Sequence, residues 1–501
     1  MKLGTTLAAA SIAVALAPST AHASGEAKNV IFFLGDGMGP ATVTASRIYR
    51  YGEAGRLTME TLPRTARIKT FSKNAQTTDS APSMSAYMTG VKMDNDVISM
   101  SEDTKLQKPK CDTTNGKAAK TILELAKAAG KSVGAVTTAE ATHATPAATY
   151  AHICNRDIAR HIAVQAVPGE PEYNAALTDG LNVLMGGSQA HWLPVTPPSP
   201  GGSNPPWAPD PDSRNLFEKL SQGPQKYTVA LTKEAFDAVD PSKTTKLVGI
   251  FSPSGHLDYE LDRVKKATPA QPSLAEMTTK AIDVLVNASK TSGDKGFFLM
   301  VEGGRIDHAL HATNAKRALA DTIAFDEAIA AALKKVDLKN TLIVVTADHD
   351  HTMTINGYSR RAGATTAQDP GILGFVRDPN GDLAKDGNNL PYTILSFGNG
   401  PRRPDLRGED DMKALAEDPN KPGTPLAGSG GALTLDPNAP AGGDPGADNY
   451  YQLGGVRTKV GSETHGGGDV MLMAGGAGSQ SFKGTLDNTR VFTLLKEALG
   501  L

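Results

Sequence analysis

The fold is decided by one short stretch near the start of the chain, Asn29-Val30-Ile31-Phe32-Phe33-Leu34-Gly35-Asp36-Gly37-Met38-Gly39. Residues 30–34 are all apolar, with no polar residue at alternate positions. An unbroken apolar run of this length is typical of a strand that is buried on both faces of a parallel sheet. The glycines that follow mark the point where the strand ends.

Similar runs rich in Val, Ile and Phe recur along the chain, at residues 132–137, 246–251, 296–301, 341–346, 392–397 and 469–474. Helical periodicity occurs between them, at residues 121–129, 273–288 and 315–335. Because strands alternate with helices, the sequence predicts an α/β fold with a large, mostly parallel central sheet flanked by helices on both faces. In such folds the active groups lie on loops at the C-terminal ends of the strands.

Asp36 occupies such a position, directly after the first strand. Glycines on both sides of a carboxylate allow the backbone and a cation to approach closely, which suits a metal ligand. The pattern G-x-G-x-G differs from the dinucleotide fingerprint G-x-G-x-x-G. A turn aspartate without a ligand is the alternative interpretation.

Ser80 lies in the segment Thr77-Thr78-Asp79-Ser80-Ala81-Pro82-Ser83-Met84. Pro82 predicts the start of a helix, which would place Ser80 at the N-terminal end. Exposed N–H groups and the helix dipole favour phosphate oxygens and a forming alkoxide at that end. Taken alone, the serine is better explained as a helix N-cap.

A carboxylate and an imidazole are paired downstream, at Asp307 and His311. Their spacing of four residues puts both on one face of a helix, where they can reach the same ion. Glu302 follows the strand at 296–301 and is close enough to serve a neighbouring ion.

Further ligand candidates follow other strands. Asp348 and His349 come after the run at 341–346, and His465 precedes the run at 469–474. A mixed His/Asp set suits zinc, whereas an all-oxygen set suits magnesium. A single histidine is more often structural, but repeated carboxylate–imidazole pairs at strand ends favour a metal centre.

Together these segments resemble the metal-dependent alkaline phosphatases, over nearly the whole chain apart from a long insertion. The motifs that carry the resemblance are Asp36-Gly37-Met38-Gly39, Asp79-Ser80-Ala81, Thr138-Ala139-Glu140, His143-Ala144-Thr145-Pro146, Arg156, Glu302, Asp307, His311, Thr346-Ala347-Asp348-His349 and Thr464-His465-Gly466.

The resemblance implies two Zn²⁺ and one Mg²⁺. The first zinc would be held by Asp307, His311 and His465. The second zinc would be held by Asp36, Asp348 and His349, with Ser80 as its exchangeable ligand. Magnesium would be held by Asp36, Thr145 and Glu302. Arg156 matches the phosphate-binding arginine of the family.

Three histidines are expected to lie just behind these ligands. His143 and His308 occupy positions where some bacterial members of the family carry Asp and Lys and the animal enzymes carry His. His351 matches a supporting histidine that orients a metal ligand. The last zinc histidine is separated from His349 by 116 positions, which leaves open what covers the rim of the site.

The implied function is hydrolysis of phosphate monoesters through a phosphoserine on Ser80. Two alternatives remain open at this point: a sulfatase or phosphodiesterase of the same superfamily, and an exported protein that binds phosphate or zinc without catalysis. Sulfatases need C/S-x-P-x-R, whereas this chain has Met84 at the arginine position.

Composition and the N-terminus limit the surroundings in which the protein works. The 501 residues include 51 Lys+Arg and 53 Asp+Glu, a balance that carries no nucleic-acid-binding signature. A positive start, an apolar run of about a dozen residues and the sequence Ala21-His22-Ala23 predict a signal peptide over residues 1–23, hence a periplasmic or secreted protein. The mature chain, 24–501, is expected to form one catalytic domain without a membrane anchor. The family resemblance implies a homodimer.

Residues 360–456 are predicted to be a loop-rich insertion within this domain, since Gly and Pro make up about one third of residues 401–450. The run at 392–397 is predicted to be a core strand inside it. Residues 378–382 resemble part of a calcium loop but lack its glycine and closing glutamate, which favours plain turns. Cys111 and Cys154 are the only cysteines; export permits them to pair, and two free thiols are the alternative.

Overall fold

The computed structural model describes residues 26–196, 205–266, 270–386, 391–401, 444–458 and 461–501, together with four short strands between positions 417 and 432. The predicted signal peptide, residues 1–23, lies outside the described residues. Among the helices of the described ranges, none combines the length and the apolar character that crossing a membrane requires. The division into a domain and an insertion stays a prediction.

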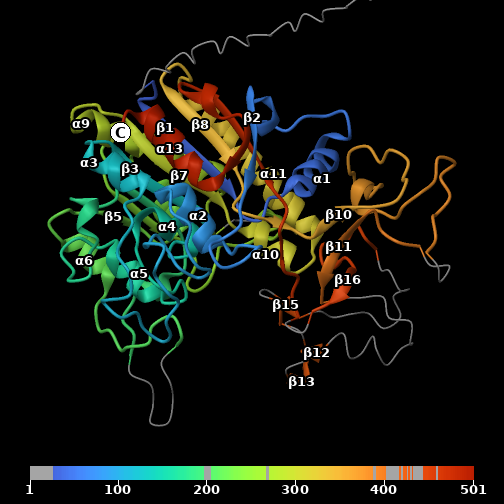
Figure 1. Ribbon diagram of the computed structural model, residues 1–501, viewed down its shortest axis with the longest axis horizontal. Helices are drawn as coiled ribbons and strands as arrows, with labels where there is room; N and C mark the ends of the chain where they lie inside the picture. The colour runs from blue at the N-terminus through green and yellow to red at the C-terminus, as the bar shows by residue number, and fades with distance from the viewer. Residues whose placement is uncertain are drawn as a thin grey trace, which may run out of the picture.

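A ten-stranded sheet forms the centre of the molecule, in the order β19-β2-β18-β8-β1-β7-β3-β4-β6-β5 (Figure 1). Its strands are β1 (Asn29–Gly35), β2 (Arg64–Lys69), β3 (Ser132–Glu140), β4 (Val183–Gly187), β5 (Thr228–Ala230), β6 (Leu247–Ile250), β7 (Phe297–Gly303), β8 (Thr341–Thr346), β18 (Val470–Gly476) and β19 (Gly484–Asp487). Neighbouring strands run parallel except where β18 pairs with β2 and with β8. The predicted large, mostly parallel sheet is therefore confirmed.

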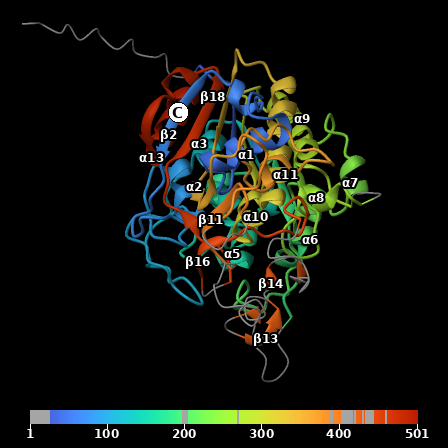
Figure 2. The same ribbon diagram turned by 90° about the vertical axis from the view of Figure 1, so that its right-hand side faces the viewer.

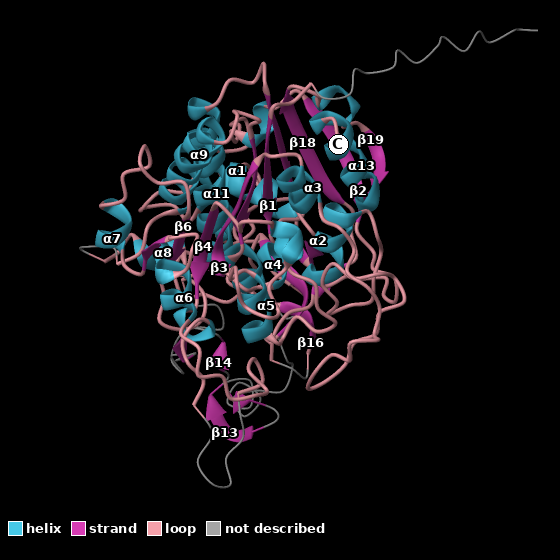
Figure 3. Ribbon diagram, turned by 90° about the vertical axis from the view of Figure 1, so that its left-hand side faces the viewer, coloured by secondary structure: helices cyan, strands magenta, loops and turns pink. Residues whose placement is uncertain are grey.

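Helices cover both faces of the sheet, as Figure 3 shows with α9 and α11 on one side and α2, α3, α4 and α13 on the other. The helices are α1 (Pro40–Tyr51), α2 (Ser80–Thr89), α3 (Ile122–Ala128), α4 (Ala144–Tyr150), α5 (Ala159–Gln165), α6 (Leu216–Gln222), α7 (Lys233–Asp237), α8 (Glu260–Arg263), α9 (Leu274–Thr291), α10 (Arg305–His311), α11 (Ala315–Lys335) and α13 (Asn488–Leu499). The predicted helices at 121–129, 273–288 and 315–335 correspond to α3, α9 and α11. A capping box formed by Ser273 and Glu276 explains why α9 begins where it does.

The central strands β1, β7 and β8 explain why their apolar runs are unbroken. Every residue of β7 and β8 is buried, and so is every residue of β1 after Asn29. By contrast, the apolar runs of the sequence do not predict β2. Only Ala66 and Ile68 are buried in it, while Arg64, Arg67 and Lys69 are exposed. Such a half-exposed strand lacks the continuous apolar run that identified the others.

A second, three-stranded sheet lies at the right of Figure 1 and faces the viewer in Figure 2. It consists of β10 (Met353–Ile355), β11 (Leu395–Gly400) and β16 (Gly454–Arg457). The strand expected at 392–397 thus begins three residues later, as β11, and pairs outside the central sheet. The expectation that it belongs to the central parallel sheet was wrong, although Leu395 and Phe397 are buried in the hydrophobic core. Four further strands pair in twos: β12 (Glu417–Asp418), β13 (Lys421–Pro425), β14 (Ala427–Gly428) and β15 (Gly431–Ala432).

Two small features complete the fold. Residues 378–382 form a turn in which the Asp378 carboxylate accepts hydrogen bonds from the N–H groups of Asn380 and Asp382. The two-residue strands β9 (Asp350–His351) and β17 (His465–Gly466) pair antiparallel, with His465 opposite His351. This pairing closes the 116-position gap between His349 and His465 in the sequence.

Candidate active site

Parallel pairing brings three predicted carboxylates to one edge of the sheet. Leu34 of β1 lies beside Glu302 of β7 and beside Thr346 of β8. Asp36 and Asp348, each two residues further along, therefore reach the same edge as Glu302, and all three side chains are buried. This is where ligands bind in open α/β sheets.

Ser80 is the first residue of α2, and its side chain does not cap the helix. The helix is capped by Asp79, whose carboxylate accepts a hydrogen bond from the N–H of Ala81 at 2.7 Å. The interpretation of Ser80 as the N-cap is therefore wrong. Its Oγ instead lies 3.4 Å from Oδ1 of Asp36 and 3.3 Å from Nε2 of His349.

The predicted ligands of the first zinc converge. Ligand atoms of Asp307, His311, His351 and His465 all lie within 4.8 Å of one another. Nε2 of His311 is 3.0 Å from Nε2 of His465, and both nitrogens are 3.4 Å from Oδ1 of Asp307. A site for one ion between these three residues fits the predicted ligand set.

The second predicted set lies beside it. Nε2 of His349 is 3.4 Å from Oδ1 of Asp36 and 3.4 Å from Oδ2 of Asp348. The ring of His349 stacks on that of His465, with centroids 3.5 Å apart. The two predicted zinc sites are thus neighbours, and Asp36 and His349 of the second site flank Ser80.

The ring orientation of the three ligand histidines fits metal binding. Nδ1 of His311 lies 2.6 Å from the carbonyl oxygen of Glu463, Nδ1 of His465 lies 2.8 Å from that of Thr78, and Nδ1 of His349 lies 3.2 Å from that of Asp350. A carbonyl only accepts, so each Nδ1 carries the proton and donates. Each Nε2 is then left with its lone pair facing the centre of the site, as a metal ligand requires.

A third group lies on the other side of Asp36. Ligand atoms of Asp36, His143 and Glu302 lie within 4.8 Å of one another. Thr137, which the sequence reading did not select, donates its hydroxyl proton to Glu302 Oε2. The predicted magnesium set of Asp36, Thr145 and Glu302 is brought together, and His143 stands closer than the supporting position expected for it.

Several buried oxygens around this centre have no hydrogen-bond partner among the described residues. They are Oδ2 of Asp36, Oγ1 of Thr145, Oε1 of Glu302 and Oδ2 of Asp348. Buried polar atoms normally find partners. Four orphaned oxygens at one point, all on residues predicted as metal ligands, fit a centre built to hold cations.

Electrostatics supports the same conclusion. Burial, and then the neighbouring carboxylate of Asp348, raises the pKa of Asp36 well above its ordinary value, and burial raises the pKa of Glu302 to about 7. Asp307 behaves differently, because His311, His351 and His465 outweigh its burial and hold its pKa well below the usual range. Divalent cations would relieve the repulsion among these carboxylates.

Arg156 is held next to the residue that precedes Ser80. Its Nη1 donates to Oδ1 of Asp79 at 2.7 Å, and its Nη2 lies 2.9 Å from Nε2 of His143. Asp79 directly precedes Ser80, so the guanidinium lies at the entrance to α2. The side chain is only 18% exposed, which leaves its charge poorly screened and available to an anion.

Two residues that were not predicted from the sequence, His256 and Glu463, contact the histidines expected to support the metal ligands. The imidazole of His256 lies against that of His308, with ring centroids 4.0 Å apart, and both lie near His143. Glu463 is buried, its Oε2 lies 2.5 Å from Nδ1 of His351 and 3.9 Å from Nδ1 of the predicted ligand His311, and its Oε1 accepts a hydrogen bond from the N–H of Thr352. Its position two residues before His465 was a usable signal, because alternate residues of an extended segment share a face.

Comparison with known proteins agrees with this geometry. The family model described as alkaline phosphatase matches residues 27–501. The chain is 33% identical over 480 residues to the tissue-nonspecific alkaline phosphatase of Rattus norvegicus, covering 90% of this chain and 79% of that protein. It is 35% identical over 416 residues to the Homo sapiens protein of the same name, covering 78% and 74%.

Solved structures show the same fold. The alkaline phosphatase of Thermus thermophilus superposes with a TM-score of 0.63 at 25% identity, covering 96% of this chain and 93% of that one. The enzyme from the Antarctic bacterium TAB5 gives 0.60 at 20% identity, covering 95% and 99%. A family match over nearly the entire chain, a shared fold and a crowded His/Asp centre at the sheet edge have one explanation: the chain belongs to the alkaline phosphatase family, whose members are metal-dependent phosphatases.

Proposed function

We propose that this protein hydrolyses phosphate monoesters to an alcohol and inorganic phosphate through a phosphoserine on Ser80. The single observation that carries the proposal is the position of the Ser80 hydroxyl, at the first turn of α2 and within 3.4 Å of Asp36 and His349. Among the described serines, only Ser80 both begins α2 and has its hydroxyl close to Asp36 and His349.

The ligand sets proposed for the metals are those named above: Asp307, His311 and His465 for one zinc, Asp36, Asp348 and His349 for the other, and Asp36, Thr145 and Glu302 for magnesium. Bound there, the cations would supply Lewis-acid stabilisation of the attacking and leaving oxygens and would lower the pKa of the Ser80 hydroxyl. The Nε2 lone pairs and orphaned carboxylate oxygens support this assignment.

The remaining steps belong to the chain's own residues. Arg156 binds two non-bridging oxygens of the phosphate bidentately and so fixes the phosphorus in front of Ser80. The Ser80 hydroxyl gives up its proton as Oγ attacks phosphorus, the bond to the leaving alcohol oxygen breaks, and that oxygen takes up one proton. Water then attacks the phosphoserine, the P–Oγ bond breaks, one proton of the water goes to Oγ, and inorganic phosphate and free Ser80 are released. The N-terminal N–H groups of α2 favour the negative charge throughout.

The test is Ser80→Ala with Ser85→Ala as a matched control. Ser85 is a buried serine of the same helix whose Oγ accepts a hydrogen bond from the N–H of Ser99 instead of facing the site. We expect Ser80→Ala to reduce kcat for an aryl phosphate by ~10³-fold or more, and Ser85→Ala to change it by less than ~5-fold. Mass spectrometry should find phosphate on Ser80 after an acid quench. Turnover by Ser80→Ala near that of the unaltered enzyme would refute the covalent mechanism.

The alternatives are separated by substrate. A rate on an aryl sulfate or a phosphate diester above that on the aryl monophosphate would favour a sulfatase or phosphodiesterase. Tight phosphate binding without any turnover in added zinc and magnesium would favour a non-catalytic binding protein. We also propose export after cleavage of residues 1–23 and assembly as a homodimer, which N-terminal sequencing and sedimentation of the mature protein test.

A further inference from the structure

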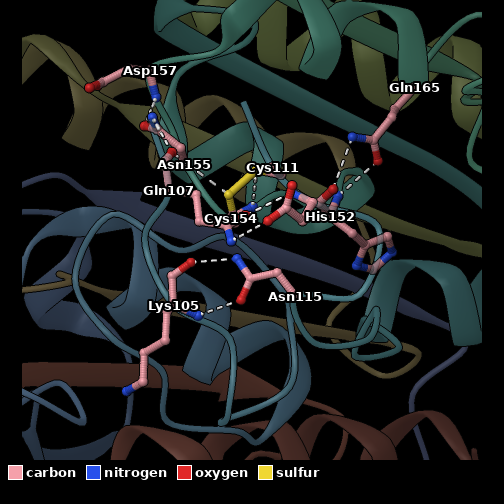
Figure 4. Close-up of a disulfide and its surroundings, with 10 residues drawn as sticks. Lys105, Gln107, Cys111, Asn115, His152, Cys154, Asn155, Asp157 and Gln165 are labelled. Atoms are coloured by element: carbon pink, nitrogen blue, oxygen red, sulfur yellow. Dashed lines mark hydrogen bonds between the residues drawn. A yellow bond between two sulfur atoms is a disulfide. The ribbon is translucent and has the colours of Figure 1, made fainter. Parts of the chain in front are cut away.

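A disulfide joins Cys111 to Cys154, two positions before Arg156 in the chain (Figure 4). The pairing that the sequence left open is therefore made, between cysteines that are 43 positions apart in the sequence and whose Cα atoms are 5.8 Å apart. Cys154 is fully buried, whereas Cys111 is partly exposed. The bond thus connects an outer loop to the segment that carries the proposed phosphate ligand.

The outer loop, residues 101–117, contains no helix and is organised by local contacts. The Asn115 side chain accepts a hydrogen bond from the N–H of Lys105 at 2.9 Å and donates to its carbonyl oxygen at 2.6 Å (Figure 4). A bridge between Met100 and Ala118 closes the loop at its base. The loop is therefore a preformed platform on which a neighbouring segment can rest.

The segment from 151 to 158 joins α4 to α5 and is itself irregular. Three contacts attach it to the platform around residue 154. They are the disulfide, a hydrogen bond from the N–H of Cys154 to Sγ of Cys111 at 3.2 Å, and one from the Asn155 side chain to the carbonyl oxygen of Gln107 at 3.1 Å. Immediately afterwards, the N–H of Arg156 donates to the carbonyl oxygen of Asp96 at 2.9 Å.

At the far end of the Arg156 side chain, the guanidinium is held by Asp79 and His143. Without the tether at Cys154, the backbone that carries Arg156 would be held by the antiparallel bridge of Ile153 with Ile98, by hydrogen bonds and by the ion pair of Asp157 with Lys108, none of which fixes residue 154 covalently to the outer loop. A bidentate contact with phosphate tolerates little displacement, since a shift of about 1 Å can cost ~10²-fold in rate. A backbone that moves more freely at residue 156 would therefore weaken the contact between the guanidinium and the phosphate.

We infer that the Cys111–Cys154 disulfide positions Arg156 and thereby sets the affinity of the site for phosphate. The inference rests on the proposed function, in which Arg156 binds the phosphate group. It assigns to the disulfide an effect on phosphate binding that is separate from the general stability that a cross-link confers.

The test uses the metal-loaded, full-length mature enzyme with both cysteines replaced, Cys111→Ser/Cys154→Ser, so that no lone thiol remains. We expect the inhibition constant of inorganic phosphate and KM for an aryl phosphate to rise by ~10-fold, with kcat at saturating substrate changed by less than ~3-fold. Zinc content, measured by mass spectrometry, should not change. The control is Leu285→Ala, a buried residue of α9 remote from the loop, which lowers stability without touching the tether.

Arg156→Ala supplies the decisive comparison. If the disulfide acts through the guanidinium, removing the disulfide from the Arg156→Ala variant should alter the phosphate inhibition constant by less than ~2-fold. An equal change in both backgrounds, or no change in either, overturns the inference. If Leu285→Ala raises the inhibition constant as much as the cysteine replacement does, the effect is one of stability and the inference also falls.

A second measurement covers the case in which the cysteine variant does not fold. Reduction of the folded enzyme by a water-soluble phosphine converts the disulfide and one water into two thiols and a phosphine oxide. The phosphate inhibition constant should rise by the same factor, and an unchanged constant after complete thiol release contradicts the inference. Failure of the proposed function would look different, since Ser80→Ala and Arg156→Ala would then leave turnover intact.

Discussion

The carboxylates of Glu463 and Asp307 bind the imidazole of His351 from opposite sides. Oε2 of Glu463 lies 2.5 Å from Nδ1 of the ring, and Oδ1 of Asp307 lies 2.7 Å from Nε2. Burial alone would lower the pKa of His351, but the two carboxylates outweigh it and raise that pKa to about 10. The ring therefore donates a proton at each nitrogen, and Glu463 fixes the orientation of Asp307 through it.

Replacing Glu463 by Gln should weaken metal binding without unfolding the protein. The amide keeps the shape but loses the charge that holds His351, and Asp307 is then free to rotate. We expect zinc affinity to fall by about 10–100-fold, the range typical for such supporting carboxylates. Competition with a chromogenic chelator measures it. Asp326→Asn is the control, a buried carboxylate that binds the N–H groups of Thr58 and Met59 away from the metal centre. An equal loss in the control would contradict the role given to Glu463.

Asp36→Asn should have opposite effects on the metal-free and metal-loaded protein. Burial and then repulsion by Asp348 raise the pKa of Asp36 well above its ordinary value, so its charge is unfavourable when no cation is bound. At pH 8 with a chelator, we expect the free energy of unfolding to rise by about 1–2 kcal/mol. With zinc and magnesium added, the variant should gain less stability than the unaltered protein. Thermal melts in both conditions check this. The control is Asp283→Asn, which removes an exposed carboxylate that pairs with Lys335.

His143→Asp should change the metal preference of the group formed with Asp36 and Glu302. An imidazole nitrogen suits zinc, whereas a third carboxylate makes the set all-oxygen and suits magnesium. We expect the magnesium affinity, relative to that for zinc, to increase by ~10-fold or more. Equilibrium dialysis with both metals measures the ratio. The same substitution at His161 of α5, far from the ligands, should leave the ratio unchanged, and a ratio unaffected by His143→Asp would refute the placement.

Asp321→Asn should flatten the pH dependence of stability. Burial raises the pKa of Asp321 to about 8, against about 3.9 in the unfolded chain. Between these values the folded state binds the extra proton, so the free energy of unfolding falls as pH rises from about 4 to 8. The amide has no proton to lose, so the variant should be more stable than the unaltered protein at pH 9 by about 1–3 kcal/mol and nearly equal at pH 4. Urea titrations at both values decide it. A larger gain at pH 4 would contradict the sign.

Residues that act through their immediate sequence neighbours were predictable. Asp307 and His311 share a helix turn, and Asp36, Glu302 and Asp348 each end a strand whose apolar run is recognisable. Glu463 and His256 were not predicted. The place of Glu463 two residues before His465 was a usable signal, but its partner His351 is 112 positions away, and His256 contacts His308, also distant in the sequence. Nothing in a single sequence shows which distant segments will pair.

The sequence by itself determined the α/β class, because burial on both faces leaves continuous apolar runs, and it supplied the candidate ligands and the candidate nucleophile Ser80 through carboxylate and imidazole spacing and the family resemblance. Only the tertiary structure decided that β17 pairs with β9, that Asp79 rather than Ser80 caps α2, and that Cys111 reaches Cys154. These outcomes depend on contacts between segments that are distant along the chain. Their free energy comes from packing, hydrogen bonding and charge in the assembled fold, which local patterns do not record.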